Sequence, residues 1–310
     1  MLNKKSKKIA VVMGGWNSER EVSLASGEAV YQALINIGYQ VVKIDFNRDI
    51  FDQIKIHQPD LIFNALHGTY GEDGRLQGLL DIIQIPYTHS GLTASAICMD
   101  KILTRKICAS VGVKSPHYEI IQQEDEIRNR EKIFELGKPF VIKPINEGSS
   151  IGVEVILANT KFDIDNYQWK FGNQMIIENY IKGKEIQVAV MGNQALGAIE
   201  IKPKGLFYDY KCKYSPGQTE YIMPAGISQE KYAEVKQLAL KCHIACGCYG
   251  VSRVDFIYND CEDGDQQFYL LEVNTHPGFT ATSLLPKIAK HVDISFEEII
   301  EYLIANAVCR

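Results

Sequence analysis

Arg253-Val254-Asp255-Phe256 and Leu271-Glu272-Val273-Asn274 are the two stretches on which the fold and the chemistry of this chain depend. They belong to two runs, 252–258 and 267–274, that read as strands because apolar residues alternate with polar ones. The acidic connection between the runs contains Asp263-Gly264, which is a strong hairpin signal. The two stretches therefore predict an antiparallel hairpin.

The polar residues of this hairpin are expected to share one face, because side chains alternate along a strand. If the strands pair in register, the residues gathered there are Arg253, Asp255, Glu272 and Asn274. The opposite face then packs into a core and consists of Val254, Phe256, Leu271 and Val273. Carboxylate and amide oxygens suit Mg²⁺ with phosphate as co-ligand, and they do not suit zinc. The alternative is a surface salt bridge on a half-exposed sheet.

Further strands are expected upstream of the hairpin, and the patterns place them at 140–143, 153–156, 175–178, 185–191 and 195–202. Pro203 ends the last of these strands because it has no N–H for a strand ladder. Helices are expected at 99–111, 124–136 and 230–246, and two more close the chain. The last two thirds of the chain therefore predict an α+β arrangement with mostly antiparallel strands.

The first third of the chain has a different pattern. Short apolar strands are expected at 9–13, 40–45 and 61–64, with helices between them and over 74–83. Ser18-Glu19-Arg20-Glu21 has the spacing of a capping box, with Ser18 at the N-cap and Glu21 at the third helical position. Continuous apolar strands separated by helices predict an α/β unit whose parallel sheet is covered on both faces.

Composition excludes several classes of protein. The chain has 310 residues, is 46% hydrophobic and carries a formal charge of −5, which is ordinary for a globular protein and does not favour nucleic acid as a partner. No apolar run is long enough to span a membrane, so no membrane partner is expected. The start is basic but its apolar run, 9–13, is too short for a signal peptide, which predicts a cytoplasmic protein. The clustered Cys242, Cys246 and Cys248 lack a usual zinc spacing and are expected to be buried thiols.

Two loops have the composition of binding segments. Residues 143–152 run from a lysine at a strand end into a Gly/Ser loop that can aim backbone N–H groups at a phosphate, although a plain hairpin turn is the alternative. Residues 204–219 read as one long loop in which aromatics alternate with lysines. Such a loop is typical of a lid. The net negative charge of the chain argues against the alternative, a surface that binds single-stranded RNA. Gly14-Gly15 fails the dinucleotide pattern, so a nicotinamide enzyme is weakly supported.

These elements, in this order, resemble the ATP-grasp enzymes, and among them the D-alanine–D-alanine ligase family. The resemblance covers nearly the whole chain, and the motifs that carry it are Gly14-Gly15, Glu19–Ser23, Leu66–Gly68, Gly71–Gly74, Pro86–Thr88, Met99–Lys101, Lys143-Pro144, Glu147–Ser150, Phe207–Tyr210, Lys213-Tyr214, Pro224–Gly226, Arg253–Asp255, Leu271–Thr275 and Pro277-Gly278. It implies an ATP-grasp fold preceded by a Rossmann-like N-terminal parallel-sheet domain. The implied domains are 1–97, 98–181 and 182–310.

The resemblance also implies an activity. The enzyme joins two D-alanines with ATP for peptidoglycan synthesis: one carboxylate attacks the γ-phosphate to give an acylphosphate, and the second amine displaces phosphate. Two Mg²⁺ ions, replaceable by Mn²⁺, and a homodimer are implied as well. Two alternatives stay open: a ligase that uses D-lactate or D-serine as its second substrate, and a nucleotide-binding protein without catalysis. Tyr214 argues against D-lactate, because the resemblance associates this tyrosine with dipeptide formation.

Site residues follow from the same resemblance. The nucleotide site comprises Lys101 and Lys143 at the α- and β-phosphates, Lys213 at the transferred phosphoryl group, Glu178, Tyr180 and Ile181 at adenine, and Glu185 at the ribose. The metal ligands are Asp255, Glu272 and Asn274. The catalytic residues are Glu19, Ser149, Tyr214, Arg253 and Ser283, and the substrate site also includes His67 and Gly278.

Individual roles are implied for the amino-acid site. Glu19 faces the ammonium group of the first D-alanine, with Ser149 and Tyr214 as its hydrogen-bonded partners. Arg253 steadies the acylphosphate, and Ser283 binds the second carboxylate at a helix start. The alternative for Glu19 is a favourable charge at a helix N-terminus, worth about 0.3–1 kcal/mol.

Overall fold

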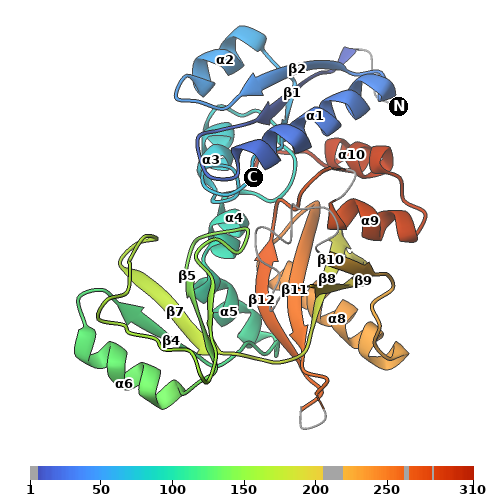
Figure 1. The fold of residues 1–310 in the computed structure, drawn as a ribbon. Helices are drawn as coiled ribbons and strands as arrows, with labels where there is room; N and C mark the ends of the chain where they lie inside the picture. Colours follow the sequence, from blue (N-terminus) through green and yellow to red (C-terminus); the bar gives the residue numbers. More distant parts are fainter. Residues whose placement is uncertain (1–5, 205–218, 262–264, 281–282) are drawn as a thin grey trace.

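The computed structural model describes residues 6–204, 219–261, 265–280 and 283–310, and they form three sheets with helices packed around them (Figure 1). The N-terminal sheet is parallel and has the order β2-β1-β3, with β1 at Lys8–Met13, β2 at Gln40–Asp45 and β3 at Leu61–Asn64. One face packs against α1 (Arg20–Ile37) and α10 (Phe296–Ala305), and the other against α2 (Ile50–His57) and α3 (Arg75–Ile82). The predicted parallel sheet covered on both faces is confirmed.

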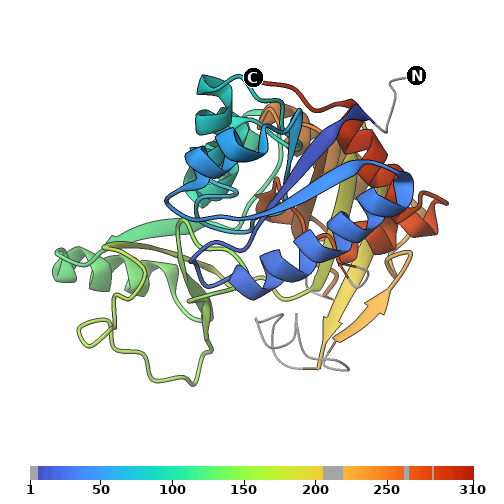
Figure 2. The ribbon, with the colours of Figure 1, turned by 90° about the horizontal axis from the view of Figure 1, so that it is seen from above.

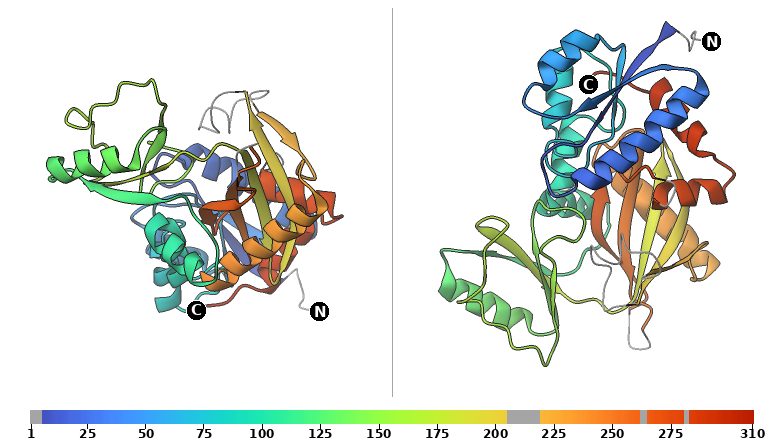
Figure 3. Two further views of the ribbon diagram at one scale, coloured as in Figure 1. Left: turned by 90° about the horizontal axis from the view of Figure 1, so that it is seen from below. Right: turned by 45° about the horizontal axis from the view of Figure 1, so that its top comes forward.

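The central sheet is antiparallel and has the order β4-β7-β5-β6. Its strands are β4 (Tyr118–Gln122), β5 (Phe140–Pro144), β6 (Glu154–Ile156) and β7 (Gln174–Asn179). Helix α6 (Glu126–Leu136) packs on one face and α5 (Lys101–Ser110) on the other. Figures 2 and 3 show that the sheet and α6 project away from the rest of the molecule.

The third sheet is also antiparallel and has the order β10-β9-β8-β11-β12. Its strands are β8 (Lys184–Met191), β9 (Gln194–Pro203), β10 (Thr219–Ile222), β11 (Val251–Tyr258) and β12 (Phe268–Asn274). Helices α4 (Leu92–Met99), α5 and α8 (Gln229–Ala245) pack on one face, and α9 (Leu284–His291) on the other. Helix α5 therefore lies between the central and third sheets (Figure 1).

Two predicted helix starts are wrong. Residues 99–111 form no continuous helix, because Asp100 is extended (ψ 108°) and its carboxylate accepts the N–H groups of Ile102 and Leu103 as the N-cap of α5. The capping box at Ser18 is also absent: α1 begins one residue later, with Glu19 at the N-cap and no side-chain cap. The chain before α1 is held by Asn17 instead of Ser18, because the side-chain oxygen of Asn17 accepts the N–H of Glu19 at 2.9 Å.

Strands β4 and β10 were not predicted, and β10 takes Thr219 out of the expected 204–219 loop. Both strands lie at sheet edges, and only one residue in either of them is fully buried, Ile121. A half-exposed edge strand buries too few side chains to leave a clear alternation. The turn Asp263-Gly264 lies outside the described residues.

The cysteine prediction is confirmed for Cys242, Cys246 and Cys248, which are buried as free thiols in the core under the third sheet, together with Cys98 and Cys108. No helix in the described part of the chain is long and apolar enough to cross a membrane. The division at 97/98 and 181/182 stays a prediction, and one core runs across it because α9 and α10 pack with β1 and α1.

Candidate active site

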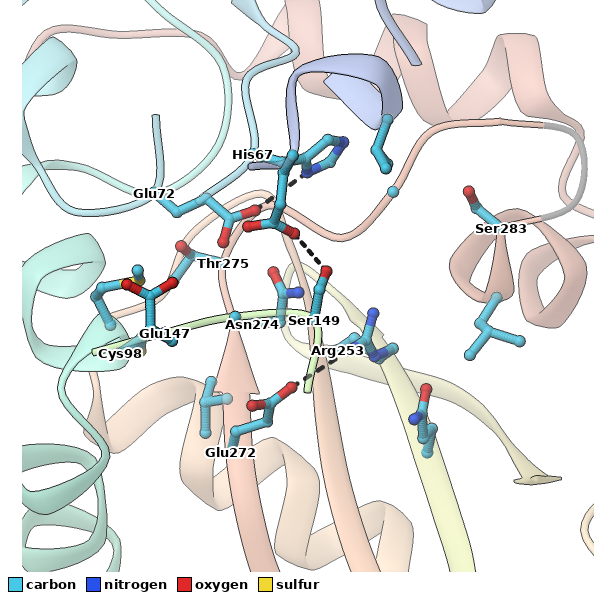
Figure 4. Close-up of a pocket in the computed structure, with 18 of the residues that line it drawn as sticks. His67, Glu72, Cys98, Glu147, Ser149, Arg253, Glu272, Asn274, Thr275 and Ser283 are labelled. Carbon is cyan, nitrogen blue, oxygen red and sulfur yellow. Dashed lines mark hydrogen bonds and ion pairs between the residues drawn. The ribbon is translucent and has the colours of Figure 1, made fainter. Parts of the chain in front are cut away.

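A cavity of about 530 Å³ separates the N-terminal part from the β11–β12 hairpin (Figure 4). Many of the predicted site residues line it together, although they come from distant parts of the sequence: Glu19, His67, Lys101, Ser149, Arg253, Glu272, Asn274, Gly278 and Ser283. The structure therefore brings the predicted amino-acid site together with part of the predicted metal site.

A second, smaller cavity of about 150 Å³ lies between the central sheet and the hairpin. The predicted nucleotide residues that line it are Lys101, Lys143, Glu178, Tyr180, Ile181 and Glu185, and Asp255 and Glu272 complete the wall. Lys101, Glu147 and Glu272 line both cavities. A ligand in one cavity would thus meet a ligand in the other beside a cation and two carboxylates.

The hairpin has the predicted register around the polar residues. Asp255 pairs with Glu272 and Arg253 with Asn274, so the four polar side chains share one side. The Arg253 guanidinium donates to both oxygens of Asp255 at 2.8 Å and lies 3.6 Å from Glu272. Both carboxylates are thereby held next to a fixed positive charge.

The prediction that Leu271 faces the core is wrong. The register shifts by one residue between Asp255 and Phe256, so Phe256 pairs with Leu270 and Leu271 is the extra residue of a β-bulge. Leu270 is fully buried in the core, and Leu271 lines the smaller cavity. A bulge places two consecutive residues opposite one partner, which interrupts the simple alternation of faces. The bulge gives the smaller cavity an apolar side chain in its wall.

The oxygen set of the hairpin fits Mg²⁺ borne by a phosphate ligand. Two carboxylates and one amide are hard donors, and Mg²⁺ is usually held by one or two carboxylates together with substrate phosphates. Within the described ranges, no group of three His, Cys, Asp or Glu side chains is arranged to hold a metal by itself. Asp255, Glu272 and Asn274 therefore fit a metal that arrives with a nucleotide better than a permanently held ion.

Glu19 lies at the start of α1 with only 7% of its surface exposed. Ser149 Oγ donates to its carboxylate, so the loop of the central sheet reaches across the cavity to the N-terminal part (Figure 4). Gly68 has φ +65°, and a Cβ there would stand 2.3 Å from Glu19 Oε2. Only glycine combines that backbone conformation with that approach, so residue 68 leaves space for the carboxylate.

His67 is bound on both sides of its ring. Nδ1 lies 3.1 Å from Glu72 Oε1, and Nε2 lies 3.0 Å from Ser26 Oγ. Burial alone would lower the pKa of His67, but the hydrogen bond to Glu72 and the charges of Glu72 and Glu19 raise it above its usual value. Burial raises the pKa of Glu72. Both raised pKa values favour a proton held between His67 Nδ1 and Glu72 Oε1.

Two cations bind Glu178 in the wall of the smaller cavity, and a third, Lys101, lines the same cavity. Lys143 Nζ lies 2.6 Å from Glu178 Oε1, and Arg105 donates to Oε2. Burial lowers the pKa of Lys143 to about 8, and the neighbouring Arg105 adds to this effect while Glu178 opposes it. Burial also lowers the pKa of Lys101, whose ammonium donates to the carbonyl of Glu147. A phosphate in this cavity would relieve the crowding of these positive charges.

Ser283 is the N-cap of α9, as the predicted helix start requires. Its hydroxyl caps no helical N–H and instead accepts the N–H of Thr280 at 3.0 Å. A Cβ at position 278 would stand 2.8 Å from Ser283 Oγ, so Gly278 leaves the hydroxyl open to the cavity. Lys213 and Tyr214 lie outside the described residues.

Three site residues were not predicted: Glu72, Arg105 and Glu147. Arg105 follows Lys101 by four positions on α5, a spacing that places both side chains on one helix face. That spacing could have indicated Arg105. Glu72 and Glu147 stand in motifs that were recognised, but sequence gives no sign that their side chains face Glu19 and His67.

His89 is fully enclosed behind this site, and among the described residues its Nε2 has no hydrogen-bond partner. Burial, with the charges of His67 and Arg310, lowers its pKa to about 3. An unfolded histidine titrates near 6.5, so the unfolded chain binds a proton in this window that the native state does not. The free energy of unfolding should therefore fall as the pH falls from about 6.5 to 3, by about 1.4 kcal/mol per pH unit for this residue.

His89→Gln should remove that contribution, so its unfolding free energy should change less steeply between pH 7 and pH 4. Urea unfolding at several pH values measures the slope, independently of any loss in absolute stability. His291→Gln is the matched control, because His291 is exposed. Equal slopes for His89→Gln and the unmodified chain would contradict this assignment.

Comparison with known proteins agrees with this geometry. The family models that match are the D-Ala–D-Ala ligase C-terminus, over residues 107–305, and the D-Ala–D-Ala ligase N-terminus, over 47–90. The D-alanine–D-alanine ligase B of Mesorhizobium japonicum is 45% identical and aligns with 98% of this chain and 99% of its own. The D-alanine–D-alanine ligase of Rickettsia bellii is also 45% identical, over 99% of this chain and 94% of its own.

Solved structures give the same result. The crystal structure of a D-alanine–D-alanine ligase from Bacillus anthracis has a TM-score of 0.83 at 32% identity, with 97% of each chain covered. A D-Ala:D-Ser ligase from Enterococcus faecalis has a TM-score of 0.82 at 29% identity, over 96% of this chain and 98% of its own. The predicted ATP-grasp fold with its N-terminal parallel sheet is confirmed, and the chain belongs to the D-alanine–D-alanine ligase family.

Proposed function

We propose that this chain joins two D-alanine molecules into D-alanyl-D-alanine for peptidoglycan synthesis and converts ATP into ADP and phosphate. The observation that carries the proposal is the junction of the two cavities at Lys101, Glu147 and Glu272. One cavity offers a buried carboxylate for an ammonium group, and the other offers cations for phosphates. A carboxylate substrate and a γ-phosphate could therefore meet at the junction.

The nucleotide side would bind and orient ATP. Lys101 and Lys143 would contact the α- and β-phosphates, and Glu185 would contact the ribose hydroxyls. The residues that would meet adenine are Glu178, Tyr180 and Ile181. Asp255, Glu272 and Asn274 would hold two Mg²⁺ ions, or Mn²⁺ in their place, which when bound neutralise charge on the phosphate oxygens. Phosphoryl transfer depends mainly on such positioning and charge neutralisation.

The first D-alanine would lie between Glu19 and Arg253. Glu19 would anchor its ammonium group, and Arg253 would hold its carboxylate beside the γ-phosphate. The attacking carboxylate oxygen forms a bond to phosphorus while the bond to the ADP oxygen breaks. His67 and Glu72 would support the position of Glu19 from the far side of the pocket.

The second D-alanine would enter beside Gly278 and Ser283, with its carboxylate at the Ser283 hydroxyl. Its amine attacks the acyl carbon, loses a proton and displaces phosphate. Arg253 would stabilise the oxyanion of the tetrahedral intermediate. The roles of Lys213 at the transferred group and Tyr214 beside Ser149 stay predictions, as do the homodimer and the three-domain division. We also propose the cytoplasm as its location, because ATP is available there.

Phosphate release with ATP, Mg²⁺ and D-alanine tests the function. We expect release that requires D-alanine and fails with L-alanine, together with a product of the mass of D-alanyl-D-alanine. Mixtures of D-alanine with D-lactate or D-serine test the alternative second substrates. A preference for a mixed product would replace the proposed function by a ligase with another second substrate, and ATP binding without phosphate release would replace it by a non-catalytic nucleotide-binding protein.

A further inference from the structure

Glu178 has two cationic partners where one would satisfy its charge. Its side chain is 3% exposed, Arg105 donates to Oε2, and Lys143 lies 2.6 Å from Oε1. Burial raises the cost of the Glu178 charge, and the two cations more than compensate, so its pKa is lowered. The cluster therefore carries one positive charge in excess of its carboxylate.

Arg105 is held in place but its donors are only partly used. The residue is 2% exposed, and its guanidinium carbon lies 5.1 Å from the centre of the Tyr118 ring. In the part of the chain that the structure describes, neither its Nε nor its Nη1 makes a hydrogen bond. A guanidinium can bind a carboxylate through two parallel N–H groups, and Arg105 binds Glu178 through one. It therefore has donors in reserve next to Glu178.

Lys143 differs from Arg105 because it faces the nucleotide cavity. It lines that cavity with Glu178, Lys101 and Glu147, whereas Arg105, which lies on α5, does not line it. When the Lys143 ammonium turns toward a phosphate in this cavity, its contact with Glu178 Oε1 is weakened. A buried carboxylate that loses its partner is strongly destabilised. ATP binding through Lys143 therefore needs a second partner for Glu178.

We propose that Arg105 is a positioning residue that keeps Glu178 paired when Lys143 moves from Glu178 Oε1 to the phosphates of ATP. An unused N–H group of Arg105 then donates to the second oxygen of Glu178, Oε1, and the two side chains form a two-pronged pair. Lys101 is less suited to this task, since its ammonium donates to the Glu147 carbonyl at the junction of the cavities. The inference rests on the proposed function, which assigns Lys143 to the nucleotide.

Nucleotide affinity in the absence of D-alanine tests the proposal. Arg105→Met removes the charge and keeps an unbranched apolar stem. We expect it to weaken ATP binding about 100-fold, because Lys143 becomes the sole partner of Glu178. Adenosine has no phosphates and does not require Lys143 to move, so its affinity should change less than about threefold by the same reasoning. Arg105→Lys should restore most of the ATP affinity.

Two further variants complete the test. In a Glu178→Gln background no carboxylate needs a partner, so adding Arg105→Met should cost little further ATP affinity, which a double-mutant cycle measures. Arg130→Met is the matched control, because Arg130 binds Asp165 through two N–H groups on the exposed side of the central sheet. It should leave ATP affinity unchanged.

The outcomes separate the inference from the proposed function. If Arg105→Met weakens ATP and adenosine equally, or leaves ATP affinity unchanged, the positioning role is wrong. An undiminished loss in the Glu178→Gln background also overturns it. If the unmodified chain binds no ATP or releases no phosphate with D-alanine, the proposed function itself fails, whatever the variants do.

Discussion

Glu272→Gln is expected to reduce turnover by about 1,000-fold while leaving the fold intact. The substitution keeps the shape of the side chain and removes its charge. Glu272 lies on the β11–β12 hairpin, lines both cavities, and has its carboxylate 3.6 Å from the Arg253 guanidinium. Its loss should therefore remove one of the proposed metal ligands and unbalance the Arg253–Asp255 pair, both beside the proposed position of the γ-phosphate.

Steady-state rates of phosphate release at saturating ATP and D-alanine measure the effect, and thermal unfolding measures the fold. We expect a small change in Tm, because Glu272 faces a cavity and not the core. Glu220→Gln is the matched control, since Glu220 lies in the same sheet with its side chain 63% exposed. A Glu272→Gln enzyme with nearly full activity would reject the metal assignment.

Periodicity was enough to predict most of the fold. Strands β2 and β3 are predicted to the residue, because each is a compact run of strand-forming residues bounded by polar or turn-forming ones. The polar face of the hairpin also follows from alternation, since Asp255 and Glu272 pair directly. These features are local, and the sequence within each strand determines them.

The wrong or missing predictions concern interactions that cross the structure. The bulge at Leu271 depends on the partner strand. The side chain that binds the N–H of Glu19 before α1 is Asn17, whose amide also binds the carbonyls of His67 and Thr69. The spacing of Arg105 from Lys101 indicates its face of α5, but its partner Glu178 is set by the packing of β7 against that helix. Sequence patterns describe one element at a time and cannot predict such contacts.

The second large effect is expected for Glu19→Gln, which should lower kcat/KM for D-alanine by about 100- to 1,000-fold. The ammonium group of the first substrate would enter a buried pocket whose counter-charge is gone. Gly68 and Gly148 pack against the Glu19 carboxylate, so little space remains for a compensating water. ATP affinity should change little, because Glu19 does not line the smaller cavity.

Stereoselectivity gives an independent measure of the same anchor. Glu19 and Arg253 would fix two substituents of the substrate α-carbon, so the methyl group of L-alanine must point where that of D-alanine does not. Without the ammonium anchor the substrate can rotate about its carboxylate, and the ratio of kcat/KM for D- over L-alanine should shrink along with the activity. Glu28→Gln, an exposed substitution on the same helix, should change neither quantity. An unaltered D/L ratio in Glu19→Gln would mean that another group anchors the ammonium. Glu72 and Glu147 also line the larger cavity, so they would be the next residues to replace by mutation.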